Sequence, residues 1–506
     1  MRRVAVVGGG IAGLATCLHL RDAAASIPGG LDVALFEAGP RPGGHIGTEA
    51  VDGFLVERGP NGYLDNVPAM ARLVRRLGLE ADIVRAEGHA AKRYLYRRGT
   101  LHLLPAGPGS FLVSPLLSLP GRLRVLLEPF ARGAPEGVDE TVHEFAGRRI
   151  GREAAEVLVD AMVSGVFAGD ARKLSLASAF PKMAAMEEEH GSLTRAMIAR
   201  LRDRRSAARH GRRSGDGGAA PDPPTRAGGP AGPGGTLTSF RGGLASLIHG
   251  VADTLGSTVR TSERVLAVER PHPGPLSAGP AWRIVREPGE RVAADAVVLA
   301  TPAPAAASLV QALDPSLATD LAGIASAGVA VVALGFHAAA MGGPPEGFGF
   351  LAPRGEGLRS LGCLWDSSLF PGRAPDGEVL LRVMIGGAHD PEALELDDDD
   401  LVAVARRDLA AAMGVTAAPH LLRVFRHRAG IPQYERGHRA RLDRIEERLR
   451  GLPGLWLTGC SYRGVSMNAC VETAQRQCEE IVRFLARLES DPWPPSSSAA
   501  STSCSA

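Results

Sequence analysis

The stretch VAVVGGGIAGLATCLHL, residues 4–20, places Gly8, Gly10 and Gly13 at G-x-G-x-x-G spacing directly after an apolar run. A strand, glycine turn and helix of this kind binds a dinucleotide, because the glycines let the pyrophosphate approach and the helix start offers unpaired N–H groups. A second apolar run, residues 32–37, ends in Glu37. The Glu37 carboxylate can accept hydrogen bonds from both ribose hydroxyls and would repel a 2′-phosphate, which disfavours NADP.

A secretory signal peptide is the alternative interpretation of the same stretch. Arg2 and Arg3 precede the apolar residues, and the small residues at 22–26 resemble a cleavage site. The glycine spacing and the acidic residue at position 37 have no role in a signal peptide, whereas a nucleotide site needs both. The sequence therefore favours the nucleotide-binding interpretation.

Composition limits the remaining classes of function. The chain has 506 residues, of which 45% are hydrophobic, enough for a large core. Its length predicts roughly three domains. A net charge of +2 and an aromatic content of 5% give no reason to expect a nucleic-acid partner. The six cysteines form no C-x-x-C pair, so we expect neither a disulfide framework nor a metal site, and we expect a cytoplasmic location.

Periodicity along the chain predicts an α/β fold. Residues 67–80 predict an amphipathic helix, and residues 138–167 predict a helical segment capped by Asp139 or Thr141. Alternating patterns over residues 320–410 predict an antiparallel sheet inserted in the nucleotide-binding domain. Disorder is predicted where large apolar side chains are nearly absent, in a loop at 206–235 and a tail at 490–506.

One segment is a candidate for contact with a membrane. No part of the chain reaches the ~20 uninterrupted apolar residues that span a bilayer. Residues 115–130 combine apolar side chains at helical spacing with Arg122 and Arg124. This pattern fits a core helix of a soluble domain or a peripheral membrane contact, and the core helix is the favoured interpretation.

The residues after Glu37 help to distinguish FAD from NAD. The pair Gly43-Gly44 offers a second close approach of the backbone to phosphate and flavin, and it resembles the R-x-G-G-R motif of the flavin amine oxidase superfamily. His45 stands where that motif has its second arginine. An ordinary turn is the plain alternative. Because the pair follows Glu37 so closely, the sequence favours FAD.

Seven further motifs carry a more specific resemblance over almost the whole chain. They are ERGPNGYLD (57–65), AAKRYLYRRGTLHLLP (90–105), SGVFAGDARKLSLASAFPKM (164–183), SFRGGLASL (239–247), EGFGFLAP (346–353), GIPQY (430–434) and GLWLTGCSYRGVSMNAC (454–470). With these motifs the chain resembles the protoporphyrinogen oxidase family, FAD enzymes of late haem biosynthesis.

The resemblance implies a fold of three parts. These are a Rossmann-like FAD-binding domain in three segments, a mainly helical domain that contacts the membrane, and an inserted antiparallel-sheet substrate domain. The FAD-binding segments would be residues 1–92, 236–305 and 426–489, the helical domain 93–205 and the substrate domain 306–425.

The resemblance also implies a reaction and partners. The reaction is the six-electron oxidation of protoporphyrinogen IX, with O2 reduced to H2O2. No catalytic side chain is expected, because hydride passes to flavin N5 and the protein contributes binding and orientation. A homodimer, hand-over of product to ferrochelatase and contact with the cytoplasmic face of the inner membrane stay open.

Individual site residues follow from the same resemblance. A porphyrinogen is a large apolar macrocycle with two propionates, so its pocket should be apolar with a fixed arginine. Arg93 matches a position that pairs with a propionate, and Gly165 a position close over the macrocycle. The matching wall residues are Leu351, Leu364 and Met384. The matching FAD contacts are Gly8, Gly9, Gly10, Ile11, Ala12, Gly13, Glu37, Ala38, Gly43, Gly44, His45, Gly59, Pro60, Asn61, Gly62, Val265, Cys460, Val465, Ser466 and Met467.

Each assignment has a plain alternative. Arg93 fits a basic surface strand, Gly165 fits a helix terminus, and the three wall residues fit an ordinary core. Some amine oxidases tether flavin through a cysteine, but the sequence around Cys460 lacks the tether motif, so we expect non-covalent FAD.

Three alternative functions stay open. They are oxidation of coproporphyrinogen III, whose four propionates need more cations, an amine or carotenoid oxidoreductase, and a non-catalytic FAD-binding homologue. The last is kept open by His45 and by Ala469, which replaces a usual aspartate.

Overall fold

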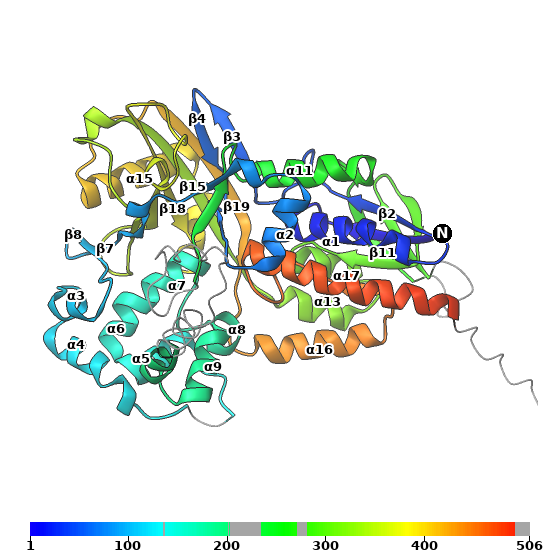
Figure 1. Ribbon diagram of the computed structural model, residues 1–506, viewed down its shortest axis with the longest axis horizontal. Helices are drawn as coiled ribbons and strands as arrows, with labels where there is room; N and C mark the ends of the chain where they lie inside the picture. Colours follow the sequence, from blue (N-terminus) through cyan, green and yellow to red (C-terminus); the bar gives the residue numbers. More distant parts are fainter. Residues whose placement is uncertain (135–136, 201, 203–233, 271–280, 491–506) are drawn as a thin grey trace, which may run out of the picture.

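The computed structural model describes residues 1–134, 137–200, 202, 234–270 and 281–490. The predicted loop at 206–235 and the predicted tail at 490–506 lie almost wholly outside these residues. Figure 1 shows a nucleotide-binding layer at one end of the molecule, a large sheet at the other end and a group of helices beneath that sheet.

A five-stranded parallel sheet forms the nucleotide-binding part. Its side chains alternate between two buried faces, as expected for parallel strands covered on both sides. Val4 and Val6 face one core, and Ala5 and Val7 face the other. In order across the sheet the strands are β10 (Val259–Arg260), β2 (Leu31–Phe36), β1 (Arg2–Val7), β14 (Ala296–Leu299) and β20 (Leu455–Leu457).

Helices cover one face of this sheet, and a mixed layer covers the other. The first group is α1 (Ile11–Asp22), α2 (Pro68–Arg76), α11 (Ala245–Leu255) and α17 (Met467–Ser490), which lie together in Figure 1. The second layer is β11 (Val265–Glu269), β12 (Trp282–Arg286), β13 (Glu290–Ala294), α12 (Ala303–Val310), α13 (Pro315–Ala322) and α16 (His438–Arg450). The helix predicted at 67–80 corresponds to α2.

A seven-stranded sheet forms the second part. Every neighbouring pair is antiparallel except β16 and β7, which run parallel. In order the strands are β19 (Leu421–Pro432), β15 (Ser326–His337), β18 (Glu378–Gly386), β17 (Ser360–Trp365), β16 (Gly349–Leu351), β7 (Arg93–Arg97) and β8 (Thr100–Leu103). Helix α15 (Asp398–Met413) packs on one face of this sheet and shares a core with the sheet residues Phe350, Cys363 and Val383.

The α/β class with a separate large sheet and a helical part is confirmed. The domain limits stay predictions, and two strands bear on them. Strand β7 begins at Arg93 and joins the large sheet, although residues 93–205 are assigned to the helical domain. Strand β19 runs unbroken through the predicted limit at residue 425.

Short elements connect the two parts. A hairpin is formed by β3 (Thr48–Val51) and β4 (Phe54–Glu57), and a small sheet by β5 (Tyr63–Leu64), β9 (Leu237–Phe240) and β6 (Ile83–Arg85). Helix α14 (Asp366–Leu369) follows β17 directly.

The helical segment predicted at 138–167 begins with a capped helix, Val142–Ile150. The Thr141 hydroxyl accepts from the Glu144 backbone N–H, and the Glu144 carboxylate accepts from the Thr141 N–H. Thr141 is therefore the cap, whereas Asp139 accepts from the Ser175 hydroxyl. The predicted segment is divided at Gly151. The helices are α3 (Pro108–Val113), α4 (Leu119–Leu126), α5 (Val142–Ile150), α6 (Arg152–Ala154), α7 (Asp160–Phe167), α8 (Leu176–Ala179) and α9 (Pro181–His190).

The favoured core-helix interpretation of residues 115–130 is wrong for α4. None of the α4 side chains is fully buried: Leu116 and Leu117, which enter a core, precede the helix, and Val125 packs against that core only in part. Within the described part of the chain, every helix is too short or too polar to cross a bilayer. The exposed side chains form what we call the α3–α4 apolar surface: Leu112, Val113, Leu119, Leu123, Leu126, Leu127 and Phe130.

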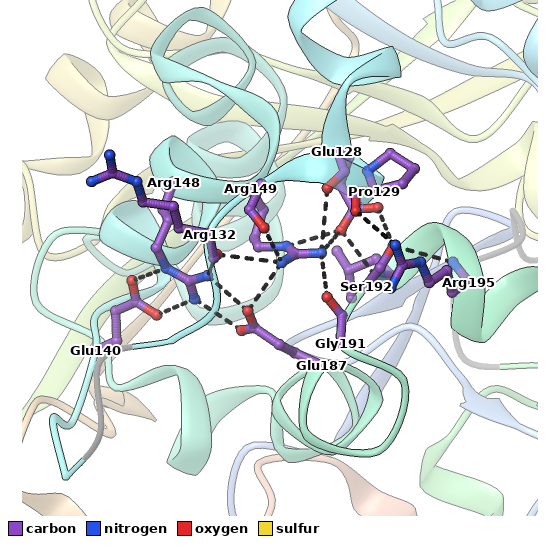
Figure 2. A network of polar contacts seen from close by, with 12 residues as sticks. Glu128, Pro129, Arg132, Glu140, Arg148, Arg149, Glu187, Gly191, Ser192 and Arg195 are labelled. Atoms are coloured by element: carbon purple, nitrogen blue, oxygen red, sulfur yellow. Dashed lines mark hydrogen bonds and ion pairs between the residues drawn. The ribbon is translucent and has the colours of Figure 1, made fainter.

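A buried ionic network supports these helices from within (Figure 2). The Arg149 guanidinium, with no exposed surface, donates to Glu128 at 2.9 Å and to Glu187 at 3.2 Å. Arg148 links the same Glu187 to Glu140 at 2.7 and 2.8 Å. Removing one member of such a network leaves a buried charge without its partner, which is strongly destabilising.

The charge of Glu128 should make this network sensitive to acid. Burial opposes ionisation of Glu128, but hydrogen bonds from Thr194, Ser192 and Arg149 outweigh it and lower the pKa from its ordinary 4.5 to about 2. Between these two values the unfolded chain binds more protons at this group than the folded chain does. The stabilisation is therefore complete above pH 4.5 and is lost as pH falls toward 2.

We expect Glu128→Gln to destabilise the protein by about 3 kcal/mol at neutral pH and to flatten the acid dependence. The measurement is the free energy of unfolding in denaturant at several pH values below 5. An identical pH slope in the variant and the parent protein would show that Glu128 does not carry this dependence.

Candidate functional site

The glycine turn of the first motif joins β1 to α1. Gly8 has a φ of +107°, and a Cβ on it would lie 2.8 Å from the Ala300 carbonyl oxygen. A Cβ on Gly13 would lie 2.0 Å from the Gly8 carbonyl oxygen, so the helix can pack against the turn only with glycine there. Ile11 and Ala12 begin α1 and are buried. The backbone is thus arranged as a dinucleotide turn requires.

Gly10 leaves open the space in which a pyrophosphate would lie. It is the N-cap of α1, and a Cβ on it would meet nothing within 4 Å. The second glycine pair lies directly beside it, since Gly43 donates its N–H to the Gly9 carbonyl at 2.7 Å. Gly44 has a φ of +57° and also borders Gly10. The fold therefore brings the two glycine motifs together.

The acidic residue at the end of β2 is held by the same turn. The two Glu37 carboxylate oxygens accept from the backbone N–H groups of Gly9 and Gly39, each at 2.7 Å. A carboxylate oxygen has more than one acceptor site, so these bonds orient Glu37 and leave capacity for ribose hydroxyls. Ala38 beside it is exposed, and Val265 is buried at the start of β11.

The segment from Gly59 to Gly62 contains a buried amide in need of partners. Within the described residues, the Asn61 side chain is 9% exposed and neither its nitrogen nor its oxygen has a hydrogen-bond partner. A buried amide is normally satisfied, so these atoms point to a ligand or to water. Pro60 is partly buried, and a Cβ on Gly62 would lie 2.6 Å from the Thr238 carbonyl oxygen.

Arg382 of β18 fixes this segment from the large sheet. It donates to the carbonyl oxygens of Glu57 and Gly59, each at 2.9 Å, and it forms an ion pair with Asp366. The side chains of Arg382 and Asp366 are at most 1% exposed. The geometry of the Gly59 segment therefore depends on a charge pair in another part of the fold.

Glu57 lies in the same buried region. Burial raises the pKa of Glu57, although Arg373 and hydrogen bonds from Leu244 and Thr48 act in the opposite direction. Its oxygens accept from the Leu244 N–H and the Thr48 hydroxyl, each at 2.8 Å. These bonds join the β3–β4 hairpin to α11, so the role of Glu57 is structural.

His45 does not supply the positive charge of the arginine it replaces. Burial and the neighbouring His427 lower the pKa of His45 to about 4, so it is neutral at neutral pH. The two imidazole rings meet edge to face at 4.9 Å. Burial also lowers the pKa of His427, whose Nε2 lies 2.7 Å from the Arg58 carbonyl oxygen. Both imidazoles are therefore uncharged at neutral pH, although the charges of Arg41 and Arg58 lie close enough to act on His427.

The C-terminal turn begins α17 and contacts β5, which directly follows the Gly59 segment. The Ser466 hydroxyl accepts from the Ala469 N–H at 3.1 Å, which caps the helix that Met467 begins. Asn468 donates to the Leu64 carbonyl oxygen at 2.7 Å. Val465 and Cys460 are partly exposed in this turn, and a hydrogen bond from Cys470 lowers the pKa of the Cys460 thiol.

Thr301 is a candidate site residue that the sequence motifs do not single out. It follows β14, its methyl carbon lies 3.2 Å from the Cβ position of Gly8, and its hydroxyl is buried without a partner among the described residues. The sequence signal for it is the run of small residues at 300–303 that directly follows β14. A hydroxyl beside the glycine turn can donate to a phosphate.

The register of the large sheet places the predicted substrate residues on one face. Arg93, Gly349, Leu364 and Arg382 lie opposite one another in one row across four strands. Leu351, Gly362 and Met384 form the next row. Alternate residues of a strand share a face, so both rows point the same way.

Helix α7 lies over this face. A Cβ on Gly165 would come within 2.7 Å of a Leu351 methyl carbon. The three apolar residues of the face, Leu351, Leu364 and Met384, stay partly exposed, whereas Phe350 and Val383 on the opposite face are at most 3% exposed. The guanidinium of Arg93 lies 4.8 Å from the centre of the Phe348 ring. The structure brings all five predicted substrate residues to this face, and their roles stay predictions.

A separate cavity of about 580 Å³ lies elsewhere, between α16, β20 and α17. Its lining includes Trp456, Gln477 and Phe484 but none of the predicted flavin or substrate residues. The candidate site is therefore the junction of the glycine turns, the Gly59 segment, the α17 start and the Arg93 face.

The parallel sheet, the glycine turn and Glu37 define a dinucleotide-binding protein, and the second glycine pair with the α17 turn is typical of flavoproteins. The chain belongs to the family of flavin-containing amine oxidoreductases, whose model matches residues 11–482. Its cofactor is a flavin.

Individual relatives match over nearly the full length of this chain. Coproporphyrinogen III oxidase of Bacillus subtilis is 30% identical and covers 96% of this chain and 98% of its own. The chloroplastic protoporphyrinogen oxidase of Oryza sativa subsp. japonica is 33% identical, and the match covers 95% of this chain and 88% of that relative. A crystal structure from Exiguobacterium sp. 255-15, of a protein proposed to be a protoporphyrinogen oxidase, has a TM-score of 0.76 at 26% identity, and the match covers 95% of this chain and 99% of that one.

Proposed function

We propose that this protein is an FAD-dependent oxidase of protoporphyrinogen IX, which it converts to protoporphyrin IX with O2 as the electron acceptor and H2O2 as the second product. Similarity to relatives named for this activity supports the proposal. The observation that carries it is the sheet face on which Arg93 stands in line with partly exposed apolar residues. An apolar wall with a cation at one side fits a macrocycle that carries propionates.

The residues present fit FAD. The open space at Gly10 and the adjacent glycine pair suit a pyrophosphate, and Glu37 suits the adenosine ribose. The unpartnered groups of Asn61 and Thr301 supply polar contacts. When bound, FAD would supply the redox chemistry by accepting hydride from the macrocycle and passing electrons to O2. We propose that it binds non-covalently.

The side chains of this chain would act by binding and orientation. The pKa of His45 at about 4 makes it an uncharged neighbour at neutral pH. Arg93 would fix one propionate and so set which edge of the macrocycle faces the flavin. Gly165 would present no side chain toward the macrocycle, and its lack of a Cβ also lets α7 pack closely on Leu351 at the edge of the substrate face.

The test is anaerobic mixing of the purified yellow protein with protoporphyrinogen IX. We expect the flavin absorbance to bleach, and we expect fluorescent porphyrin and H2O2 to form after air is admitted. A yellow protein that neither bleaches nor forms porphyrin would support the non-catalytic homologue, and a colourless protein that takes up no flavin would refute both.

Coproporphyrinogen III is the second candidate substrate, because the Bacillus subtilis relative carries that name. Its four propionates call for more cations than one. Arg382 is neutralised by Asp366, and Arg354 donates to Asp160 at 2.7 and 2.9 Å. These pairings favour the substrate with two propionates. Parallel assays of the two porphyrinogens, compared by kcat/KM, decide between them.

We expect Arg93→Ala to raise KM for the porphyrinogen by about 10–100-fold while flavin content stays unchanged, because it removes a charge-assisted contact. Lys92→Ala is the matched control, since Lys92 is exposed and paired with Glu346. An unchanged KM in Arg93→Ala would remove Arg93 from the substrate site.

We also propose that the α3–α4 apolar surface contacts a membrane, at the cytoplasmic face. Val113 is 78% exposed, Leu119 62% and Phe130 81%, and such exposed apolar groups beside Arg122 and Arg124 suit an anionic lipid surface.

The triple variant V113S/L119S/F130S should bind anionic vesicles at least about tenfold more weakly in co-sedimentation, because each substitution removes apolar contact area. Leu266→Ser, at an exposed position of β11, is the control. Equal sedimentation of the triple variant and the parent protein would contradict a membrane role for this surface.

A further inference from the structure

Three side chains with metal-binding groups meet at one end of the large sheet, away from the flavin and substrate residues. His337 ends β15, Glu378 begins β18 directly opposite it, and His420 immediately precedes β19. Strand β15 lies between β18 and β19, so the sheet order places all three residues together. Glu378 precedes Arg382 on β18 by four residues, roughly 13 Å along an extended strand.

The three side chains converge on a small volume. The His337 Nδ1 atom lies 2.7 Å from one Glu378 oxygen, and the His420 Nε2 atom lies 3.4 Å from the other. The two imidazole rings stack at 4.5 Å with 21° between their planes. The candidate ligand atoms all lie within 4.8 Å of one another.

This arrangement suits a divalent transition metal. Two imidazoles and one carboxylate form a common protein ligand set for zinc, with a fourth position open to water. Ligand atoms about 2.0–2.2 Å from a tetrahedral metal lie about 3.4 Å from one another, so small side-chain movements would complete the site. His337 is 69% exposed and Glu378 16%, which leaves room for water and gives a route for the metal to enter.

A second group of three metal-binding side chains already has a cation of the protein at its centre. Asp160, Asp170 and His389 are equally close, but the Arg354 guanidinium lies among them, 2.7 Å from Asp160, 3.3 Å from Asp170 and 3.1 Å from His389. A cation is already supplied there by the protein. Among the described residues, no lysine or arginine is recorded in a hydrogen bond or ion pair with the carboxylate of Glu378.

We propose that His337, Glu378 and His420 bind one zinc ion that links the ends of three neighbouring strands. The ion would act apart from the proposed oxidation, because the cluster lies at the far end of the sheet face that carries Arg93, four residues along β18 from Arg382. Zinc binding would stabilise the folded chain, in which the three ligands are brought together, over the unfolded one.

The test is calorimetric titration of the flavin-loaded protein with ZnCl2, together with thermal unfolding. We expect one equivalent bound at micromolar or lower concentration and a higher Tm with zinc. His337→Ala and His420→Ala should each weaken binding at least tenfold, and the double variant should lose the equivalent and the rise in Tm. His249→Ala, at an exposed position of α11, should behave as the parent protein.

Glu378→Gln keeps the shape of the side chain and tests the carboxylate without a large change to the fold. Its affinity for zinc should also fall at least tenfold. Equal zinc uptake by the parent protein and the double variant, or binding by the parent protein only at millimolar zinc, would overturn the proposal and leave the cluster as a surface ion pair. Flavin content and oxidase activity should stay unchanged in these variants, so the outcome is independent of the proposed function.

Discussion

Replacing Arg382 with methionine is expected to destabilise the protein by about 3–5 kcal/mol and to lower its flavin content sharply. Methionine fills similar volume but leaves the Asp366 carboxylate buried without its cation, since neither side chain is more than 1% exposed. It also removes the donor that holds the Glu57 and Gly59 carbonyl oxygens. The free energy of unfolding and the ratio of flavin to protein absorbance measure the two effects.

A second variant separates these two contributions. R382M/D366L removes both charges, so it should recover much of the lost stability but not the fixed geometry of the Gly59 segment. Arg428→Met, which removes an exposed ion pair with Glu395, should change neither quantity. Full flavin content in Arg382→Met would show that Arg382 does not position the Gly59 segment.

Alanine substitutions at Gly10 and at Gly13, both in the first glycine motif, are expected to impair the protein for different reasons. A Cβ on Gly10 meets nothing within 4 Å, and the φ of Gly10 is −70°, so Gly10→Ala should leave the fold of the flavin-free protein intact. The methyl group would occupy the space for the pyrophosphate, so FAD affinity should fall at least about 100-fold. A Cβ on Gly13 would lie 2.0 Å from a backbone oxygen, so Gly13→Ala should destabilise the flavin-free protein itself.

The measurement is thermal unfolding of the flavin-free proteins, followed by titration with FAD. We expect the flavin-free Tm to be unchanged in Gly10→Ala and several degrees lower in Gly13→Ala. Tight FAD binding by Gly10→Ala would place the pyrophosphate elsewhere and would contradict the nucleotide site proposed for this turn.

Fold prediction succeeded where the signal was local. The strand, glycine turn and helix at the N-terminus and the helix near residue 67 follow from residues a few positions apart, and the structure contains both. The core-helix interpretation of residues 115–130 was wrong for α4, because an apolar helical stripe looks the same whether it is covered or exposed. Only the packing of neighbouring elements decides between these outcomes.

The sequence by itself determined that a dinucleotide turn forms at Gly8–Gly13, because steric limits on the backbone there depend on adjacent residues. It also indicated the flavin family through short motifs. The tertiary structure alone decided that Arg93 shares a face with Met384, that Arg382 holds Gly59, and that His337, Glu378 and His420 meet. These contacts depend on strand order and register between segments far apart in the chain, which no local pattern of residues specifies.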